Sequence, residues 1–149
     1  MIVRAADAAD VTAVAEVASA SYRAAFADIL DAAELARRDA ASFVARFGEN
    51  LDKLRVAEAD GRVVGFSLVS GAHLDMLFID PTAQGSGAGR ALLAEAVGRG
   101  VSSLECFRAN QPARRFYERL GWVVTRAYSR PFAGRVHDFV FCERNARAD

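Results

Sequence analysis

Hydrophobic positions in the first fifty residues recur three or four apart, the spacing of helices with one buried face. The first predicted helix begins near Asp7 or Asp10, whose carboxylates can accept hydrogen bonds from free backbone N–H groups. Its buried stripe consists of Val11, Val14, Ala18, Tyr22 and Phe26. A second helix is predicted over residues 32–47, ending at Gly48. A short strand at residues 2–4 precedes both helices.

From residue 54 the hydrophobic period changes to that of extended chain. Residues 54–59 and 62–69 read as two strands joined by Asp60-Gly61, a dipeptide that accepts the positive φ angles of a tight hairpin turn. Residues 74–79 form a nearly unbroken apolar run, as expected for a strand covered on both faces. The middle of the chain is therefore predicted to be antiparallel sheet.

The remaining pattern alternates strands and helices. Helices are predicted over residues 87–97 and from Asn110 to Gly121, and strands over 101–107, 122–128 and 136–142. Residues 129–135 read as a turn region between the last two strands. The order predicts an α/β fold with a mixed central sheet of about seven strands flanked by about four helices, parallel between 74–79 and 101–107.

Composition and charge narrow the class of protein. The chain has 149 residues, of which 52% are apolar, enough for one domain over residues 1–149 with a frayed tail at 143–149. Lys and Arg together number 19, as do Asp and Glu, so the basic excess typical of nucleic-acid binders is absent. Nucleic acid is not an expected partner.

The amino terminus has no apolar core of a signal peptide, and no stretch is long enough to span a membrane. We therefore expect a cytoplasmic protein with no membrane partner. Cys106 and Cys142 lie far apart, in apolar runs without metal-ligand spacing, so we expect reduced core thiols and no metal site.

The segment from Gln84 to Arg90, with glycines at 85, 87 and 89, is the most informative motif. Between a buried strand and a helix, backbone N–H groups at the helix's positive end stabilise phosphate oxygens, and Arg90 adds a charged donor. Two other interpretations compete: a plain flexible turn, and a dinucleotide fold, since Gly85-Ser86-Gly87 begins a GxGxxG pattern with Glu105 twenty residues on. Arg90 at the third glycine position weakens the latter, and no Walker sequence occurs.

Two motifs together suggest a family. Gln84-x-x-Gly87-x-Gly89, preceded by Leu-Phe-Ile-Asp-Pro at 77–81, resembles the coenzyme A motif of the GNAT superfamily of N-acetyltransferases. Asn110, Ala113 and the run 116–122 resemble the family's second signature at its usual distance. The resemblance is specific over residues 74–122; the first fifty residues match only in general form.

The resemblance implies that two neighbouring strands splay apart to admit acetyl-coenzyme A. Main-chain groups of Leu77, Phe78 and Ile79 would then pair with the pantetheine arm. The diphosphate would be held by Gln84, Gly85, Ser86, Gly87, Ala88, Gly89 and Arg90. Asn110 would contact the pantetheine region or serve only as a helix cap.

For catalysis, Tyr117 matches the family's usual acid position and is expected to protonate the leaving thiolate. Three candidates for the base remain open: His73, Asp75 and Glu105. His73 falls where related acetyltransferases carry a glutamate or histidine base, Asp75 shares its face of the strand, and Glu105 lies where ribosomal-protein acetyltransferases place a functional glutamate. A histidine side chain titrates near neutrality, which suits a base.

The expected function is transfer of acetyl from acetyl-coenzyme A to a primary amine of a small molecule or peptide, by direct attack in a ternary complex. A non-catalytic acyl-coenzyme A sensor or interaction module is the alternative. A nicotinamide-binding protein is a third. The acceptor stays open, as does the oligomeric state, with a homodimer one option.

Overall fold

The protein was analysed as a computed structural model that describes residues 1–144. Within these residues there are seven strands and five α-helices. The α/β class and the strand number agree with the prediction, while the helix number is one higher. The chain divides into two compact units, Met1–Val101 and Ser102–Asp149, which are described separately.

The sheet of the first unit is wholly antiparallel. Its strands are β1 (Ile2–Ala5), β2 (Leu54–Ala59), β3 (Arg62–Ser70) and β4 (His73–Ile79), in that spatial order. The turn between β2 and β3 has φ of 53° at Asp60 and 74° at Gly61, both in the left-handed region, so the predicted hairpin is confirmed.

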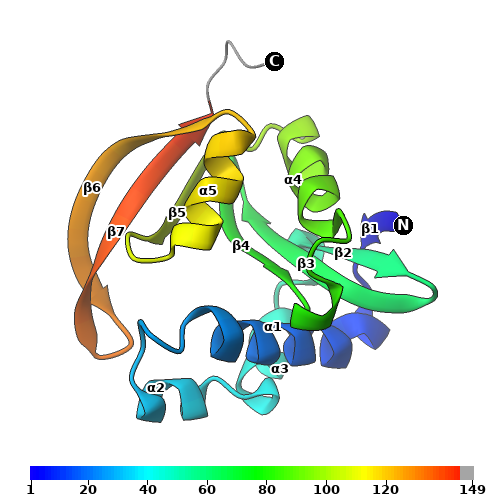
Figure 1. Cartoon of the computed structure of the whole chain (residues 1–149). Helices are drawn as coiled ribbons and strands as arrows, with labels where there is room; N and C mark the ends of the chain where they lie inside the picture. The colour runs from blue at the N-terminus through cyan, green and yellow to red at the C-terminus, as the bar shows by residue number, and fades with distance from the viewer. Residues whose placement is uncertain (145–149) are drawn as a thin grey trace. The chain divides into compact units, whose positions relative to one another are not determined.

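Helices cover both faces of this sheet (Figure 1). Helices α1 (Val11–Ala25) and α3 (Ala40–Gly48) lie on one side, and α4 (Ala88–Gly98) lies on the other. The α1 side carries an aromatic cluster whose neighbouring ring centroids are 4.8–5.9 Å apart; its members are Tyr22, Phe26, Phe43, Phe47, Phe66 and Phe78. Ala57, Val64, Ala88 and Leu92 form the buried cluster beneath α4.

The single helix predicted over residues 32–47 is wrong. The segment forms two helices, α2 (Ala32–Arg37) and α3, separated at Arg38, whose ψ of 49° leaves the helical region. Asp39 then begins α3 by accepting a hydrogen bond from the Ser42 N–H at 2.9 Å. A side-chain cap that satisfies the free N–H groups of a new helix competes directly with helix continuation.

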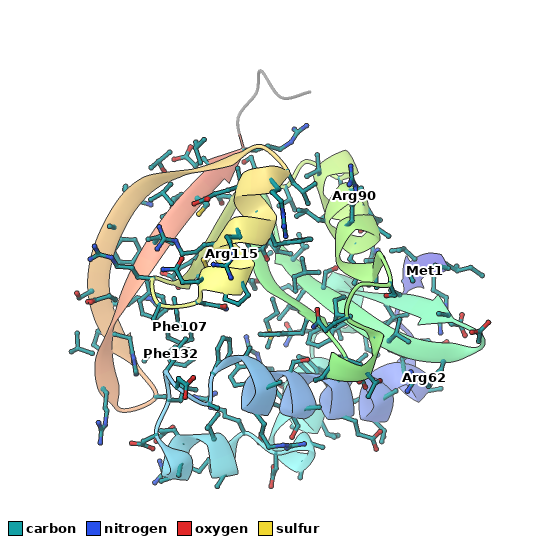
Figure 2. The ribbon with its side chains drawn as sticks, viewed as in Figure 1. Met1, Arg62, Arg90, Phe107, Arg115 and Phe132 are labelled. Carbon is teal, nitrogen blue, oxygen red and sulfur yellow. The ribbon has the colours of Figure 1, made fainter. Side chains whose placement is uncertain are left out.

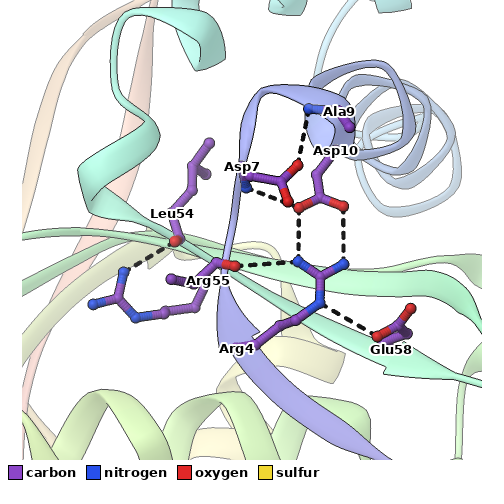
Figure 3. A network of polar contacts seen from close by, with 8 residues as sticks. Arg4, Asp7, Ala9, Asp10, Leu54, Arg55 and Glu58 are labelled. Carbon is purple, nitrogen blue, oxygen red and sulfur yellow. Dashed lines mark hydrogen bonds and ion pairs between the residues drawn. The ribbon is translucent and has the colours of Figure 1, made fainter.

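A polar network joins the amino-terminal strand to the start of α1 (Figure 3). The Arg4 guanidinium donates to both Asp10 carboxylate oxygens at 2.8 and 3.0 Å, and to Glu58 on β2 at 3.3 Å. Asp10 also accepts from the Asp7 N–H at 2.9 Å, in a capping box. The hydrogen bonds from Arg4 hold the pKa of Asp10 below its usual value, against the opposing effect of burial.

The second unit has strands β5 (Ser103–Phe107), β6 (Trp122–Phe132) and β7 (Arg135–Arg144), paired antiparallel in the order β5-β7-β6. Helix α5 (Gln111–Arg119) precedes β6. The expected turn region at 129–135 is wrong, because both strands run on to a two-residue turn at Ala133 (φ 53°) and Gly134 (φ 81°). Of the tail predicted to fray, Glu143 and Arg144 belong to β7, and residues 145–149 lie outside the described residues.

Candidate functional site

The glycine loop between β4 and α4 adopts a conformation that requires its glycines. Gly85 has φ of 80° and Gly87 has φ of 89°, in the left-handed region that costs an L-residue about 1–2 kcal/mol. A Cβ built on either residue would meet no atom within 4 Å. The glycines are therefore needed for backbone conformation, and the space beside them is open to a ligand.

Helix α4 begins at this loop with a long side-chain hydrogen bond, in which the Ala88 N–H donates to the Ser86 hydroxyl at 3.4 Å. Gly87 is its N-cap residue and makes no side-chain hydrogen bond, having no side chain. The first N–H groups of any α-helix lack intrahelical acceptors and lie at its positive end. Ala88, only 1% exposed, anchors the start of the helix in the core, and Arg90 lies exposed in the first turn (Figure 2). This helix terminus is suited to a phosphate or another anion.

Leu77, Phe78 and Ile79 are the three residues of β4 that belong to the motif. Two of them direct their main-chain N–H and C=O groups away from β3. The Asp80 N–H donates to the Val64 carbonyl at 2.8 Å, so the adjoining Gly65–Ile79 pair is of the non-hydrogen-bonded kind. Ladder alternation then directs the N–H and C=O of Phe78 toward Phe66. The main-chain groups of Leu77 and Ile79 point the other way. Among the three, Phe78 contributes its main chain to the sheet itself.

The side chain of Gln84 turns back onto β4. Its Nε2 donates to the carbonyl oxygen of Ile79 at 3.2 Å. Asp80, the residue after β4, accepts from the backbone N–H of Thr82 at 2.9 Å and from its hydroxyl at 2.7 Å. These bonds lower the pKa of Asp80. The loop that leads to the glycines is thus ordered by its own polar side chains.

His73 and Asp75 lie at the start of β4, at the other end of the strand from the glycine loop. Asp75 is exposed and its carboxylate accepts a hydrogen bond from the Ser70 hydroxyl across the β3–β4 hairpin. His73 is half-buried and pairs with Ser70 in the ladder. The ladder shifts register between the two residues, because Leu68 pairs with Met76 and Val69 with Leu74, so Asp75 lies at a bulge between the buried Leu74 and Met76. That His73 and Asp75 share one face stays a prediction.

In the second unit, Asn110 precedes α5 and Tyr117 lies within it. Asn110 is the N-cap residue and its Oδ1 accepts from the Ala113 N–H at 3.4 Å, which confirms its capping role. Tyr117 is 8% exposed and its ring lies against Phe116 and Trp122, with centroids 5.2 and 6.2 Å away. Burial, with a smaller contribution from the nearby Cys106 and Cys142, raises the pKa of the Tyr117 phenol well above its usual value.

Glu105 on β5 is held by two donors from β6. Its carboxylate accepts from the Arg130 guanidinium, with Nε at 3.0 Å and Nη2 closer still, and from the Tyr128 hydroxyl. Arg130 also stacks over Phe139, with its Cζ 4.2 Å from the ring centroid. Burial and then the hydrogen bond to Glu105 raise the pKa of Tyr128 to about 12.

Sequence reasoning missed Tyr128 and Arg130 as partners of Glu105. The available signal was the two-residue spacing of Tyr128 and Arg130 in β6. These two residues pair with Phe139 and His137 of β7, and Glu105 of β5 pairs with Phe141, which is also in β7. Residues directly opposite each other share a face of the sheet, so these side chains meet. Phe107 and Phe132 also meet there, with ring centroids 5.3 Å apart (Figure 2).

Among residues 1–144, no helix combines the length and the apolar character that crossing a bilayer requires. Cys106 and Cys142 are both free thiols, as expected.

The fold and the glycine loop define a class that comparison with known proteins identifies. A family model described as an acetyltransferase (GNAT) domain matches residues 13–137, and the chain belongs to this family. The two motifs that suggested the resemblance both lie within the matched range.

Individual relatives are similar over part or all of the chain. Peptidyl-lysine N-acetyltransferase YjaB is 41% identical over 63 residues in Escherichia coli and 39% identical over 64 residues in Salmonella typhimurium. Each match covers 42% of this chain and 43% of the relative, less than half of either protein.

Solved structures match over nearly the whole chain. The solution structure of apo YjaB from Escherichia coli has a TM-score of 0.76 at 26% identity and covers 96% of this chain and 97% of its own. A GCN5-related N-acetyltransferase from Rhodopseudomonas palustris has a TM-score of 0.75 at 25% identity, covering 97% and 94%. PaiA N-acetyltransferase from Thermoplasma acidophilum, crystallised with coenzyme A, shares the fold at TM-score 0.70 and 21% identity, covering 96% and 98%.

Proposed function

We propose that this protein transfers the acetyl group of acetyl-coenzyme A to a primary amine, and that the amine is a lysine side chain of a peptide. The single observation that carries the proposal is the glycine loop at the start of α4, where Gly85 and Gly87 have positive φ angles and leave open space beside the main chain. Family membership supports the donor, and the printed function of the YjaB relatives supports the acceptor.

The diphosphate of acetyl-coenzyme A would lie against the segment from Gly85 to Arg90. Within it the Ser86 N–H already donates to the Ala83 carbonyl at 3.2 Å and the Ala88 N–H to the Ser86 hydroxyl at 3.4 Å, so the main donors to the phosphates would be the N–H groups of Gly87, Gly89 and Arg90. Helix polarity and the Arg90 charge both favour an anion there. The pantetheine arm would pair with the main-chain groups of Leu77 and with the N–H of Ile79, because these point away from β3. Asn110 would add a contact to the pantetheine region beyond its role as helix cap.

The reaction is a direct attack that balances without any further reactant. The neutral amine nitrogen forms a bond to the thioester carbonyl carbon. The carbon–sulfur bond then breaks, the nitrogen loses its second proton to become the amide, and coenzyme A leaves as a thiolate that takes up one proton. Tyr117 would donate the proton that this sulfur takes up. Burial raises the pKa of Tyr117, so the phenol holds its proton at the working pH, but the same shift makes it a weaker acid; the assignment therefore rests on its place in the family motif.

The proton lost by the attacking ammonium requires a base, and the three candidates differ in their surroundings. Glu105 accepts hydrogen bonds from Arg130 and Tyr128. Asp75 accepts from Ser70. Of the three, we favour His73 as the base, because it falls where related acetyltransferases carry a glutamate or histidine base, and we give Glu105 the role of orienting Tyr128 and Arg130.

The test is a continuous assay of thiol release from acetyl-coenzyme A with a lysine-containing peptide as acceptor. The same peptide with its lysine acetylated serves as the control, since it offers no free side-chain amine. Thiol release that depends on the free lysine supports the proposal. Tight binding of acetyl-coenzyme A with no turnover across peptides and small amines would favour the sensor instead, and no binding would refute both.

A further inference from the structure

The last carbonyl of β4 accepts hydrogen bonds from two side chains that are far apart in the sequence. The hydroxyl of Ser21, in α1, donates to the Ile79 oxygen at 3.1 Å, and the Gln84 amide donates to the same oxygen at 3.2 Å. Ser21 is only 4% exposed. A serine inside a helix commonly bonds back to a carbonyl of its own helix, but this hydroxyl leaves α1 and reaches the sheet.

These bonds fix a particular peptide plane. The peptide unit that carries the Ile79 C=O also carries the Asp80 N–H, and that N–H donates to Val64 at 2.8 Å. Three hydrogen bonds, two on the oxygen and one on the nitrogen, therefore define the orientation of one rigid plane. It is the plane at which the chain leaves β4 and enters the loop toward Gly85.

Helix α1 supports the same end of β4 through packing. The ring of Tyr22, the residue after Ser21, lies 5.3 Å from the ring of Phe78, and the ring of Phe26 lies 5.9 Å from it. One turn of α1 therefore contacts both of the last two residues of β4. Of these contacts, only the Ser21 hydroxyl acts on the main chain.

We propose that Ser21 is a positioning residue for acetyl-coenzyme A. By donating to the Ile79 carbonyl oxygen, Ser21 orients the Ile79–Asp80 peptide and thereby the loop that carries the phosphate-binding N–H groups. Because this oxygen already accepts from Ser21, it is not left to bind the ligand. Gln84, a residue of the glycine motif, shares this task through its side chain. This inference rests on the proposed function, because it presumes that the loop binds acetyl-coenzyme A.

The chain offers a matched control for the test. Ser19 lies on the same helix, is also 4% exposed, and its hydroxyl accepts from the Arg23 guanidinium of that helix at 2.5 Å. Ser21→Ala and Ser19→Ala thus each remove one serine hydroxyl group, and the two sites are equally buried. Isothermal titration of each variant with acetyl-coenzyme A compares binding, and thermal unfolding without ligand compares the folds.

For Ser21→Ala we expect the Kd of acetyl-coenzyme A to rise about three- to tenfold, the range that the loss of one neutral hydrogen bond produces. For Ser19→Ala we expect a change below about twofold, which lies beneath that range. The KM for acetyl-coenzyme A should rise with the Kd, while kcat and the KM for the amine stay near their original values. A purely structural serine would lower the melting temperature without this selective effect on one substrate.

Two further variants keep the inference falsifiable. Ser21→Thr retains the hydroxyl and should restore most of the affinity. Gln84→Ala alters an exposed residue, so it tests the second donor even if Ser21→Ala fails to fold; its Kd should rise by a similar factor. Unchanged affinity in Ser21→Ala, or in Gln84→Ala if the former does not fold, overturns the inference. Failure of the unaltered protein to bind acetyl-coenzyme A would instead refute the proposed function.

Discussion

Substituting Gly87 by alanine should lower both the stability of the protein and its affinity for coenzyme A, and the two effects can be measured separately. At φ of 89° an alanine is strained by about 1–2 kcal/mol, but its Cβ would meet no protein atom within 4 Å. The stability loss should therefore be conformational only. For a domain of this size it corresponds to a fall in melting temperature of roughly 3–6 °C.

The effect on binding should be larger and specific to this position. The added methyl group would stand in the space beside the start of α4 and keep phosphate oxygens away from the N–H groups. A hydrogen bond to a charged group contributes about 1.5–3 kcal/mol, so the Kd of coenzyme A should rise at least about tenfold. Isothermal titration measures this change directly.

Gly61 provides the control, because it also has a positive φ (74°) with open space around its missing Cβ, but lies in the β2–β3 hairpin. Gly61→Ala should lower the melting temperature by a similar amount and leave coenzyme A binding unchanged. If Gly87→Ala binds coenzyme A within about twofold of Gly61→Ala, a margin smaller than even one neutral hydrogen bond allows, the phosphate cradle is refuted.

Three further substitutions test other parts of the molecule. Asp10→Ala should cost about 1–3 kcal/mol of stability at neutral pH, because Arg4 loses two charge-assisted hydrogen bonds and keeps those to Glu58 and the Ala5 carbonyl. Because the pKa of Asp10 is lowered in the folded state, this difference from the unaltered protein should shrink as pH falls below the ordinary aspartate range, which denaturant unfolding at several pH values measures. Tyr117→Phe should reduce kcat about 10²–10⁴-fold with little change in the Kd of acetyl-coenzyme A, if its hydroxyl is the acid; equal turnover in steady-state assays would exclude that role. Glu105→Gln should lower the pKa of the Tyr128 phenol from its present value of about 12, which ultraviolet titration measures. The same variant should retain far more activity than His73→Gln; if His73→Gln is instead the more active variant, Glu105 is the base.

Local features of the fold could be read from short stretches of sequence. Asp60-Gly61 predicted its hairpin because few dipeptides accept two positive φ angles, and Asn110 predicted the start of α5 because its side chain can cap a helix. The glycine loop was recognisable for the same reason, since glycines at 85 and 87 mark backbone conformations that other residues avoid. In each case the cause and its effect lie within a few residues.

Predictions failed where two local preferences competed. The apolar spacing at residues 32–47 suited one helix, but capping by Asp39 ended it in the middle. The polar and proline-containing run at 129–135 suited a turn, yet antiparallel pairing carried β6 and β7 up to Ala133 and Gly134. Strand pairing is decided by a partner elsewhere in the chain, so the sequence of one strand underdetermines its end.

The amino-acid sequence alone determined the family, the glycine loop and the candidate residues Tyr117, His73 and Glu105, because these depend on residue type and on spacing along the chain. Only the tertiary structure decided their neighbours: Arg130 and Tyr128 on Glu105, and Ser21 on the Ile79 carbonyl. Hydrogen bonds between residues 23 to 58 positions apart depend on strand register and helix packing, which are properties of the whole folded chain. The types of the site residues can therefore be read from the sequence, whereas the neighbours that affect their chemistry are set by the fold.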